Sequence, residues 1–191
     1  MTPANPDRGR AFAVVGPSGS GKDTLIAAVA GLPDLPRLPD LHPVRRVITR
    51  PESAGGEPFE GVTEAEFAAR AAAGAFALVW RAHGLQYAIP ASAVAAHRAG
   101  HTVIFNGSRA MLGQAAEVFP GLTVLLVTAR PETLAARLAA RGRESREDIA
   151  ARLARAEFAL PPGLPVIRID NDGPLDAAAA AMRAALQPES S

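Results

Sequence analysis

The chain of 191 residues is 48% hydrophobic and 20% charged, a composition that suits a single domain over residues 1–191 with a full core. Its formal net charge of +1 gives no overall electrostatic reason to bind nucleic acid or a membrane surface. The absence of cysteine excludes disulfides, thiolate metal ligands and a cysteine nucleophile. No run of residues suits a signal peptide or a membrane span, so we expect a cytoplasmic protein with frayed ends at residues 1–10 and 187–191.

The first predicted strand, residues 11–15, leads into a glycine-rich loop that ends at the only lysine of the sequence, Lys22. A helix is predicted to follow from Gly21 to about Gly31. In a strand-loop-helix unit with this spacing, backbone N–H groups cradle a polyphosphate and the lysine reaches its outer phosphates. A lone lysine beside nineteen arginines indicates a need for a compact ammonium. The predicted phosphate-binding residues are Gly16, Pro17, Ser18, Gly19, Ser20, Gly21, Lys22, Asp23 and Thr24.

The residue after the lysine is Asp23, where such loops usually carry a hydroxyl that contacts magnesium. The first hydroxyl comes one residue later, at Thr24. Asp23 could coordinate Mg²⁺ directly or through water, or it could be an acidic first-turn residue that offsets the helix dipole. Both interpretations stay open, and the predicted metal ligands are Asp23 and Thr24.

Further apolar runs alternate with alanine-rich helical stretches along most of the chain. The runs that we interpret as strands lie at residues 11–15, 44–48, 102–105, 122–128 and 166–169. Such alternation predicts an α/β fold of three layers, in which helices cover both faces of a parallel sheet.

Capping residues, first-turn prolines and glycine stops mark the predicted helix ends. The start signals are Thr63 with Glu66 as a capping box, Pro90, Pro131, and Ser145 with Asp148, and the stop signals are Gly74, Gly100 and Gly142.

Residues 130–155 hold seven arginines and four acids, a local balance of +3. Two helices joined by the turn Arg141-Gly142-Arg143 predict an arginine lid over residues 141–148 that swings cations over the phosphates. The alternative is a solvated helix pair with Glu–Arg ion pairs. Together with the phosphate loop, the lid interpretation predicts Lys22, Arg137, Arg141 and Arg143 as catalytic residues.

Several motifs resemble the guanylate-kinase-like branch of the nucleoside-monophosphate kinases. They are the phosphate loop, Ile48-Thr49-Arg50-Pro51, the helix before Gly74-Ala75-Phe76, His83-Gly84-Leu85-Gln86-Tyr87, and the arginines at 137, 141 and 143. Within that branch, the sequence resembles the ribose 1,5-bisphosphate phosphokinase family of phosphonate degradation. That second resemblance lies in Gly21-Lys22-Asp23-Thr24, Asn106-Gly107-Ser108-Arg109, Arg141-Gly142-Arg143-Glu144 and Asn171-Asp172.

The resemblance implies a phosphate-loop NTPase fold of the nucleoside-monophosphate-kinase type, with an acceptor-binding segment over about 50–90. It also implies ATP as donor, Mg²⁺ as cofactor and a sugar bisphosphate as acceptor, with 5-phosphoribosyl 1-diphosphate as product. No general base is needed, because the attacking phosphate oxygen is already anionic near neutral pH. The sequence leaves a homodimer open.

Departures from guanylate kinases favour an acceptor without a base. Guanine needs carboxylates, and the corresponding positions hold Leu78 and Asn106, while Ile89 stands where a hydroxyl is expected. Shortly after Asn106 the sequence instead has a cation, Arg109. The alternatives are guanylate kinase or another nucleotide kinase, and a binding module without catalysis, which the intact loop and lid arginines disfavour.

The expected substrate-binding residues are Thr49, Arg50, Trp80, Tyr87, Asn106, Ser108, Arg109 and Arg152. Arg50 would bind the distal phosphate of the acceptor bidentately, or form a surface ion pair. Tyr87 would hydrogen-bond the same phosphate, or be a half-buried aromatic residue, and Trp80 would form a pocket wall or part of the core. One of Arg45 and Arg46 is expected to face the pocket, and the sequence does not decide which.

Overall fold

Five parallel strands form the central sheet of the computed structural model, which describes residues 9–30, 41–54, 58–140 and 160–187. Within these residues, a second sheet has four strands. In chain order, the strands of both sheets are β1 (Ala11–Val15), β2 (Leu41–Pro43), β3 (Arg46–Ile48), β4 (Phe59–Gly61), β5 (Phe76–Ala82), β6 (Leu85–Pro90), β7 (Thr102–Asn106), β8 (Thr123–Thr128) and β9 (Val166–Asp170). The helices are α1 (Lys22–Ala30), α2 (Glu64–Ala72), α3 (Ala91–Arg98), α4 (Leu112–Val118), α5 (Pro131–Ala140) and α7 (Leu175–Leu186), with 3₁₀ turns at Glu52–Ala54 and Arg109–Met111.

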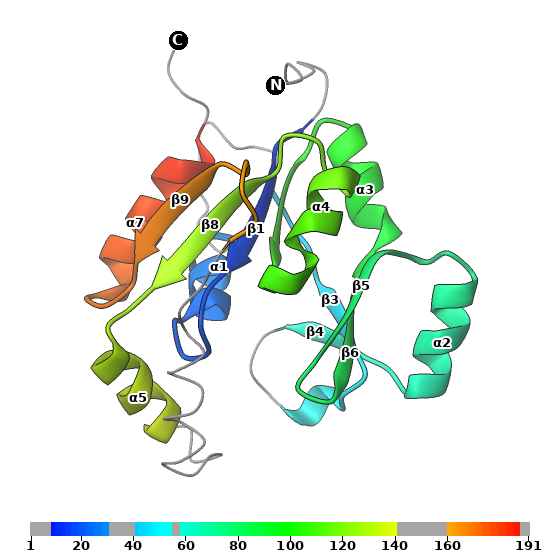
Figure 1. Ribbon diagram of the computed structural model, residues 1–191, viewed down its shortest axis with the longest axis horizontal. Helices are drawn as coiled ribbons and strands as arrows, with labels where there is room; N and C mark the ends of the chain where they lie inside the picture. Colours follow the sequence, from blue (N-terminus) through cyan, green and yellow to red (C-terminus); the bar gives the residue numbers. More distant parts are fainter. Residues whose placement is uncertain (1–8, 31–40, 55–57, 141–159, 188–191) are drawn as a thin grey trace.

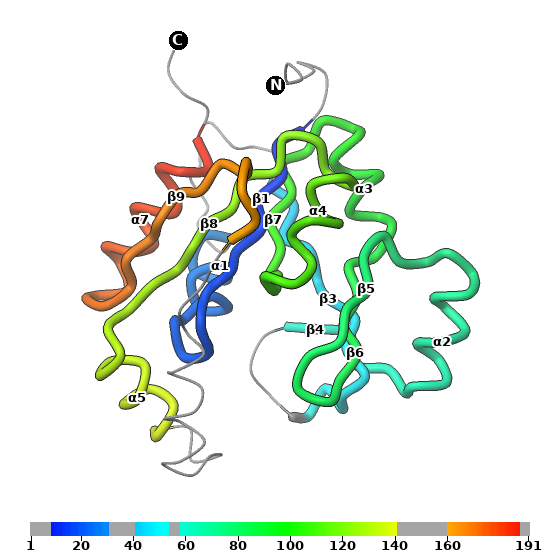
Figure 2. The backbone as a smooth tube through the Cα atoms, in the orientation of Figure 1, coloured from blue at the N-terminus to red at the C-terminus, as the bar shows by residue number. Residues whose placement is uncertain are grey.

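The central sheet has the strand order β2-β7-β1-β8-β9, and Figures 1 and 2 show β1 at its centre. Helices α1 and α7 pack on one face, and α3 and α4 lie on the other. This arrangement confirms the predicted three-layer α/β fold. None of the helices within the described residues is both long and apolar enough to cross a bilayer.

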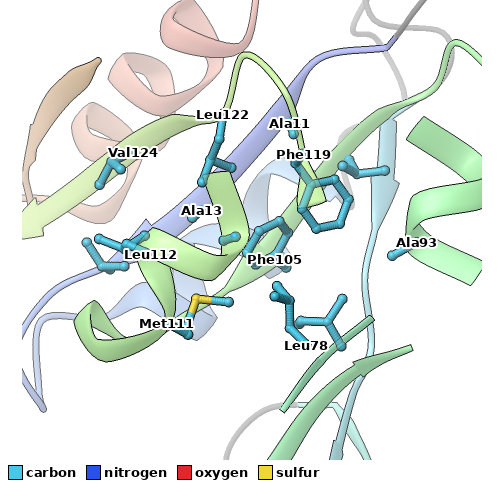
Figure 3. Close-up of a cluster of buried hydrophobic side chains, with 14 of the residues drawn as sticks. Ala11, Ala13, Leu78, Ala93, Phe105, Met111, Leu112, Phe119, Leu122 and Val124 are labelled. Carbon is cyan, nitrogen blue, oxygen red and sulfur yellow. The ribbon is translucent and has the colours of Figure 1, made fainter. Parts of the chain in front are cut away.

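Strand β1 is buried on both faces, which explains its continuous apolar sequence. Phe12 and Val14 pack in the cluster formed with α1 and α7. The intervening residues of β1 pack on the opposite side, in the cluster that contains Phe105 and Phe119 (Figure 3). The ring centroids of these two phenylalanines are 5.3 Å apart. Packing against both helical layers therefore fixes the strand from which the glycine-rich loop departs.

The prediction of one strand over residues 44–48 is right for Arg46–Ile48 and wrong in its extent, because the chain changes sheet inside that run: the Val44 N–H still donates to Ile104 of β7, and β3 begins at Arg46. Strand β2 ends at Pro43 and pairs with β7, whereas β3 belongs to a second sheet with the order β4-β3-β6-β5. In that sheet β3 runs parallel to β4 and antiparallel to β6. Val47 packs against Phe67 and Ala88 in a separate small core. The apolar run thus serves a different core from the one that the alternation of strands and helices suggested.

A hairpin of β5 and β6 completes the second sheet, and the sequence analysis did not identify it. Its turn residues His83 and Gly84 have φ angles of 51° and 73°, the left-handed conformation that two-residue hairpins require. Leu78 and Trp80 are buried and the residues between and after them are exposed, so the period-2 pattern of a half-buried strand is present.

The described helix boundaries agree with the predicted signals, with one correction. Thr63 and Glu66 form the capping box, with the Glu66 N–H donating to Thr63 Oγ1 at 3.2 Å and the Thr63 N–H donating to Glu66 Oε2 at 2.8 Å. Pro131 begins α5 and Gly100 follows α3. Pro90 was expected in the first turn of a helix, but it ends β6 and forms the N-cap of α3. The signals at 142, 145 and 148, and the lid over 141–148, lie outside the described residues.

The start of α5 is tied to the loop after β9. The Arg130 N–H donates to Asp172 Oδ1 at 3.0 Å, and the Arg130 side chain forms an ion pair with the same carboxylate. A hydrogen bond from the Thr133 side chain, followed by those from Arg130, lowers the pKa of Asp172 below its ordinary value of 3.8. The contribution of this carboxylate to stability is therefore present above pH 3.8 and is lost as the pH falls through the lowered pKa.

We predict that Asp172→Asn lowers the melting temperature at pH 7 and that the difference from the unmodified protein shrinks below about pH 4. Thermal unfolding followed by circular dichroism between pH 7 and pH 3 measures this. Asp176→Asn, at an exposed position in the first turn of α7, is the control. A difference for Asp172→Asn that stays constant over the whole pH range would contradict the prediction.

Candidate functional site

A cavity of about 880 Å³ lies between the carboxyl ends of β1 and β7 and the β5–β6 hairpin. Parallel sheets commonly bind ligands at this edge, where loops leave the carboxyl ends of the strands. The cavity wall combines the glycine-rich loop, the residues after β7, the hairpin and one residue of β3. The predicted residues that line it are Gly16, Pro17, Ser18, Gly19, Gly21, Lys22, Asp23, Thr24, Trp80, Tyr87, Asn106, Ser108 and Arg109.

The backbone of the glycine-rich loop approaches its neighbours too closely for side chains. A Cβ atom at Gly16 would lie 2.2 Å from the Val127 carbonyl oxygen, and one at Gly21 would lie 2.3 Å from Asn171 Nδ2. Gly21 also has a φ of +87°, which L residues with side chains rarely adopt. The glycines therefore let the loop fit against β8 and the residue that follows β9.

Asn171 supports the glycine-rich loop through a buried hydrogen bond. Its side chain is only 3% exposed, and its Nδ2 donates to the Ser20 carbonyl oxygen at 2.7 Å. Ser20 itself is fully buried and is not among the residues that line the cavity, so its predicted role in phosphate binding stays a prediction. The backbone of Ser20 joins the loop to the end of β9.

Lys22 begins α1 and lines the cavity. Its Nζ donates to the carbonyl oxygens of Gly16 and Pro17, each at 3.0 Å. These bonds fold the side chain back over the start of the loop. A polyphosphate on this loop would meet the lysine charge and the positive end of the helix dipole together.

Asp23 also faces the cavity, where Asn106 Nδ2 donates a hydrogen bond to Asp23 Oδ1. Asn106 ends β7 and is largely buried, so the bond connects the first turn of α1 to the neighbouring strand. Thr24 is exposed and lines the same cavity. A carboxylate and a hydroxyl are hard oxygen ligands that suit Mg²⁺, which usually takes one or two protein ligands and completes its shell with phosphates and water. The described residues hold no group of three or more potential metal-binding His, Cys, Asp or Glu side chains.

Aromatic residues and an arginine form the wall that the second sheet contributes. Trp80 and Tyr87 stack with ring centroids 5.4 Å apart and an interplanar angle of 11°. The Arg46 guanidinium carbon lies 5.9 Å from the Trp80 ring centroid and 5.2 Å from that of Tyr87. Trp80 belongs both to the cavity wall and to the core, so the two alternatives for this residue hold together.

The structure decides between Arg45 and Arg46. Arg46 is 8% exposed and lines the cavity, whereas Arg45 is exposed and forms an ion pair with Glu52 at 2.7 Å. Arg81, His83, Ala110, Leu160 and Pro161 are further lining residues that the sequence analysis did not assign. Strand alternation at Arg45-Arg46 was the available signal for Arg46, but its use required knowing which face of β3 is buried.

Ser108 and Arg109 follow β7 and line the cavity beside Asn106. Burial lowers the pKa of the Arg109 guanidinium below its ordinary value. An arginine in this position keeps its charge at neutral pH, so this part of the wall is cationic.

Several predicted site residues do not reach this cavity. Thr49 Oγ1 accepts a hydrogen bond from the Gln86 N–H at 2.9 Å, and the Arg50 guanidinium carbon lies 4.3 Å from the Phe59 ring centroid. Arg137 lines a smaller cavity of about 320 Å³ that includes Thr24 and Asn171. The ligand-binding roles of these residues stay predictions, and Arg141, Arg143 and Arg152 lie outside the described residues.

Comparisons with known proteins give relatives over nearly the whole chain, although no family model matches it. The chain is 50% identical over 186 residues to the ribose 1,5-bisphosphate phosphokinase PhnN of Ruegeria sp. (strain TM1040), covering 97% of this chain and 95% of that protein. It is 46% identical over 183 residues to the protein of the same name from Rhizobium etli (strain CIAT 652), with coverages of 96% and 92%. The solved guanylate kinase of Anaplasma phagocytophilum matches 94% of this chain and 85% of its own, with a TM-score of 0.66 and 16% identity, which shows a common fold.

We predict that Asn171→Ala lowers the free energy of unfolding by about 1 to 3 kcal/mol, because it leaves the buried Ser20 carbonyl without its hydrogen-bond donor. Chemical denaturation measures this change. The control is Gln114→Ala, which removes an exposed carboxamide on α4. Equal stability of the two variants would show that the bond between Asn171 and Ser20 does not hold the loop.

Proposed function

The chain belongs to the ribose 1,5-bisphosphate phosphokinase family, and on that premise we propose that it transfers the γ-phosphoryl group of ATP to the 1-phosphate of ribose 1,5-bisphosphate. The products are ADP and 5-phospho-α-D-ribose 1-diphosphate. The reaction belongs to phosphonate degradation, and we place it in the cytoplasm as the compartment that supplies ATP.

The chemistry needs placement and charge more than proton transfer. An oxygen of the 1-phosphate attacks the γ-phosphorus of ATP, and the bond from that phosphorus to the β–γ bridging oxygen breaks, so its electron pair leaves with ADP. The attacking oxygen is anionic near neutral pH, and no base has to remove a proton from it. Two highly charged groups must nevertheless be brought together, which is why positioning and electrostatic stabilisation dominate phosphoryl transfer.

The residues of the glycine-rich loop bind the donor in this proposal. Backbone N–H groups between Gly16 and Lys22 hold the phosphates, and the Lys22 ammonium offsets the charge that develops on the transferred group. Asp23 and Thr24 would hold Mg²⁺, which supplies charge neutralisation at the donor phosphates when bound. Arg137 and the lid arginines 141 and 143 would close over the same phosphates.

The observation that carries the choice of acceptor is the charge of the cavity wall. Among the described lining residues, Asp23 is the one carboxylate, whereas the cations are Lys22, Arg46, Arg81 and Arg109. Leu78 and Ile89, at positions where a guanine site needs polar groups, are buried in the apolar core. A guanine base would leave its N–H donors unpaired in such a cavity, whereas a sugar with two phosphates matches its cations.

Guanylate kinase activity is the alternative within the same fold, and the missing base-reading carboxylates argue against it. A binding module without catalysis is the alternative outside enzymes. The intact loop with Lys22 in its cavity wall supports a catalytic protein instead.

We predict that Asp23→Asn raises the Mg²⁺ concentration needed for half-maximal activity, because an amide is a weaker magnesium ligand than a carboxylate. If Asp23 only offsets the helix dipole, stability falls by about 0.3 to 1 kcal/mol and the metal dependence does not change. Activity measured across a Mg²⁺ titration, together with the melting temperature of each protein, separates the two roles. An unchanged titration midpoint would exclude the metal role.

We predict that kcat/KM for ribose 1,5-bisphosphate exceeds that for GMP by at least about 1,000-fold, since a binding site discriminates strongly against ligands whose polar groups it leaves unpaired. Incubation with ATP and each acceptor, with products resolved by ³¹P NMR, measures this. Lys22→Ala should abolish turnover of either acceptor and serves as the inactive control. Efficient conversion of GMP to GDP, without 5-phosphoribosyl 1-diphosphate from the sugar, would refute the proposal.

A further inference from the structure

Arg46 is a buried cation on the side of the cavity that the second sheet forms. It begins β3, is 8% exposed and lines the cavity. Its neighbour Arg45 points to the exposed side, where it forms an ion pair with Glu52. The two adjacent arginines thus carry the same side chain, but one is buried at the cavity and the other is exposed to solvent.

Two stacked aromatic rings support the Arg46 guanidinium. It lies within 6 Å of both ring centroids, at 5.9 Å from Trp80 and 5.2 Å from Tyr87. Aromatic faces attract a cation electrostatically. Arg46 also lines the cavity, so a ligand can reach it. The planar fork of an arginine matches the oxygens of a phosphate and can bind two of them at once.

The position of this group in the fold indicates which end of an acceptor it would meet. The reacting phosphate must lie near the glycine-rich loop, which follows β1 of the central sheet. Arg46, Trp80 and Tyr87 come from the second sheet, which Figure 1 shows beside the central sheet and not continuous with it. An acceptor that spans the cavity therefore places its far end at Arg46.

We propose that Arg46 binds the non-reacting phosphate of the acceptor, which is the 5-phosphate of ribose 1,5-bisphosphate. This assignment rests on the proposed function and adds a specificity-determining residue to it. Arg50, to which the sequence analysis gave this phosphate, lies over Phe59 and outside the cavity lining. The Arg46 guanidinium on its aromatic platform makes the cavity select acceptors that carry a second phosphate.

The molecule contains its own probe for the test, because Trp80 is the single tryptophan of the sequence and lies beside Arg46. Ligand binding is followed by Trp80 fluorescence in the full chain, without nucleotide. The ligands are ribose 1,5-bisphosphate and ribose 1-phosphate, which lacks the 5-phosphate. The proteins are the unmodified chain, Arg46→Gln, and Arg45→Gln as the matched control.

We expect Arg46→Gln to raise the Kd for ribose 1,5-bisphosphate about 100-fold, the scale expected when one partner of a desolvated charge pair is removed. The Kd for ribose 1-phosphate should change less than about threefold, and Arg45→Gln should bind both ligands like the unmodified chain. Equal losses for both ligands, unchanged affinity in Arg46→Gln, or an equal loss in Arg45→Gln would overturn the assignment.

A measurement on the unmodified chain covers the case in which Arg46→Gln does not fold. Ribose 5-phosphate should change Trp80 fluorescence and ribose 1-phosphate at the same concentration should change it much less, and equal responses would overturn the assignment. If the unmodified chain neither binds nor phosphorylates ribose 1,5-bisphosphate, the proposed function fails and the assignment fails with it. If it does both while Arg46→Gln keeps its affinity, the assignment alone fails.

Discussion

The close fit of the glycine-rich loop against the ends of β8 and β9 is the constraint on which the site depends. Gly16 leaves no room for a side chain beside the Val127 carbonyl, and Asn171 donates to the backbone of Ser20 while its Nδ2 occupies the space beside Gly21. These contacts require β1, β8 and β9 to lie side by side in parallel register, as they do. The buried sheet therefore sets the path of the loop, and the loop sets where Lys22 and Asp23 enter the cavity.

A second sheet forms the other wall of the cavity, so two structural units contribute different binding groups to it. The loop after β1 presents N–H groups and an ammonium, which suit the phosphates of a donor. The β5–β6 hairpin and β3 present stacked aromatic rings and Arg46. The residues after β7, including Arg109, lie between the two. In the proposed reaction each substrate would have its own cations, and the reacting groups would meet between them.

The sequence predicts four of the five described strands of the central sheet and the glycine-rich loop, for different physical reasons. Strands β1, β7 and β8 are buried on both faces or nearly so, and such strands consist of continuous apolar runs. The edge strand β9 is mostly exposed, and its apolar residues alternate with polar ones. The loop is recognised because the spacing of its glycines and Lys22 follows from backbone geometry. The second sheet is harder to predict, because β3 and β4 have three residues each and the run at 44–48 spans a change of sheet.

The individual roles of side chains depend on information that a local pattern does not contain. Arg45 and Arg46 are chemically identical, and only the packing of β3 against β6 separates the exposed one from the buried one. Thr49 and Arg50 lie in a family motif, yet their described contacts are with Gln86 and Phe59. Ser20 belongs to the glycine-rich loop in the sequence, but its side chain is buried in the interior.

The burial of Leu78 and Ile89 beside Phe105 limits how this protein could evolve. A carboxylate introduced there to recognise guanine would be a charge placed in the hydrophobic core. A change of acceptor through these two positions would therefore first cost the protein its fold, so this lineage could reach base recognition only after the hairpin had been repacked.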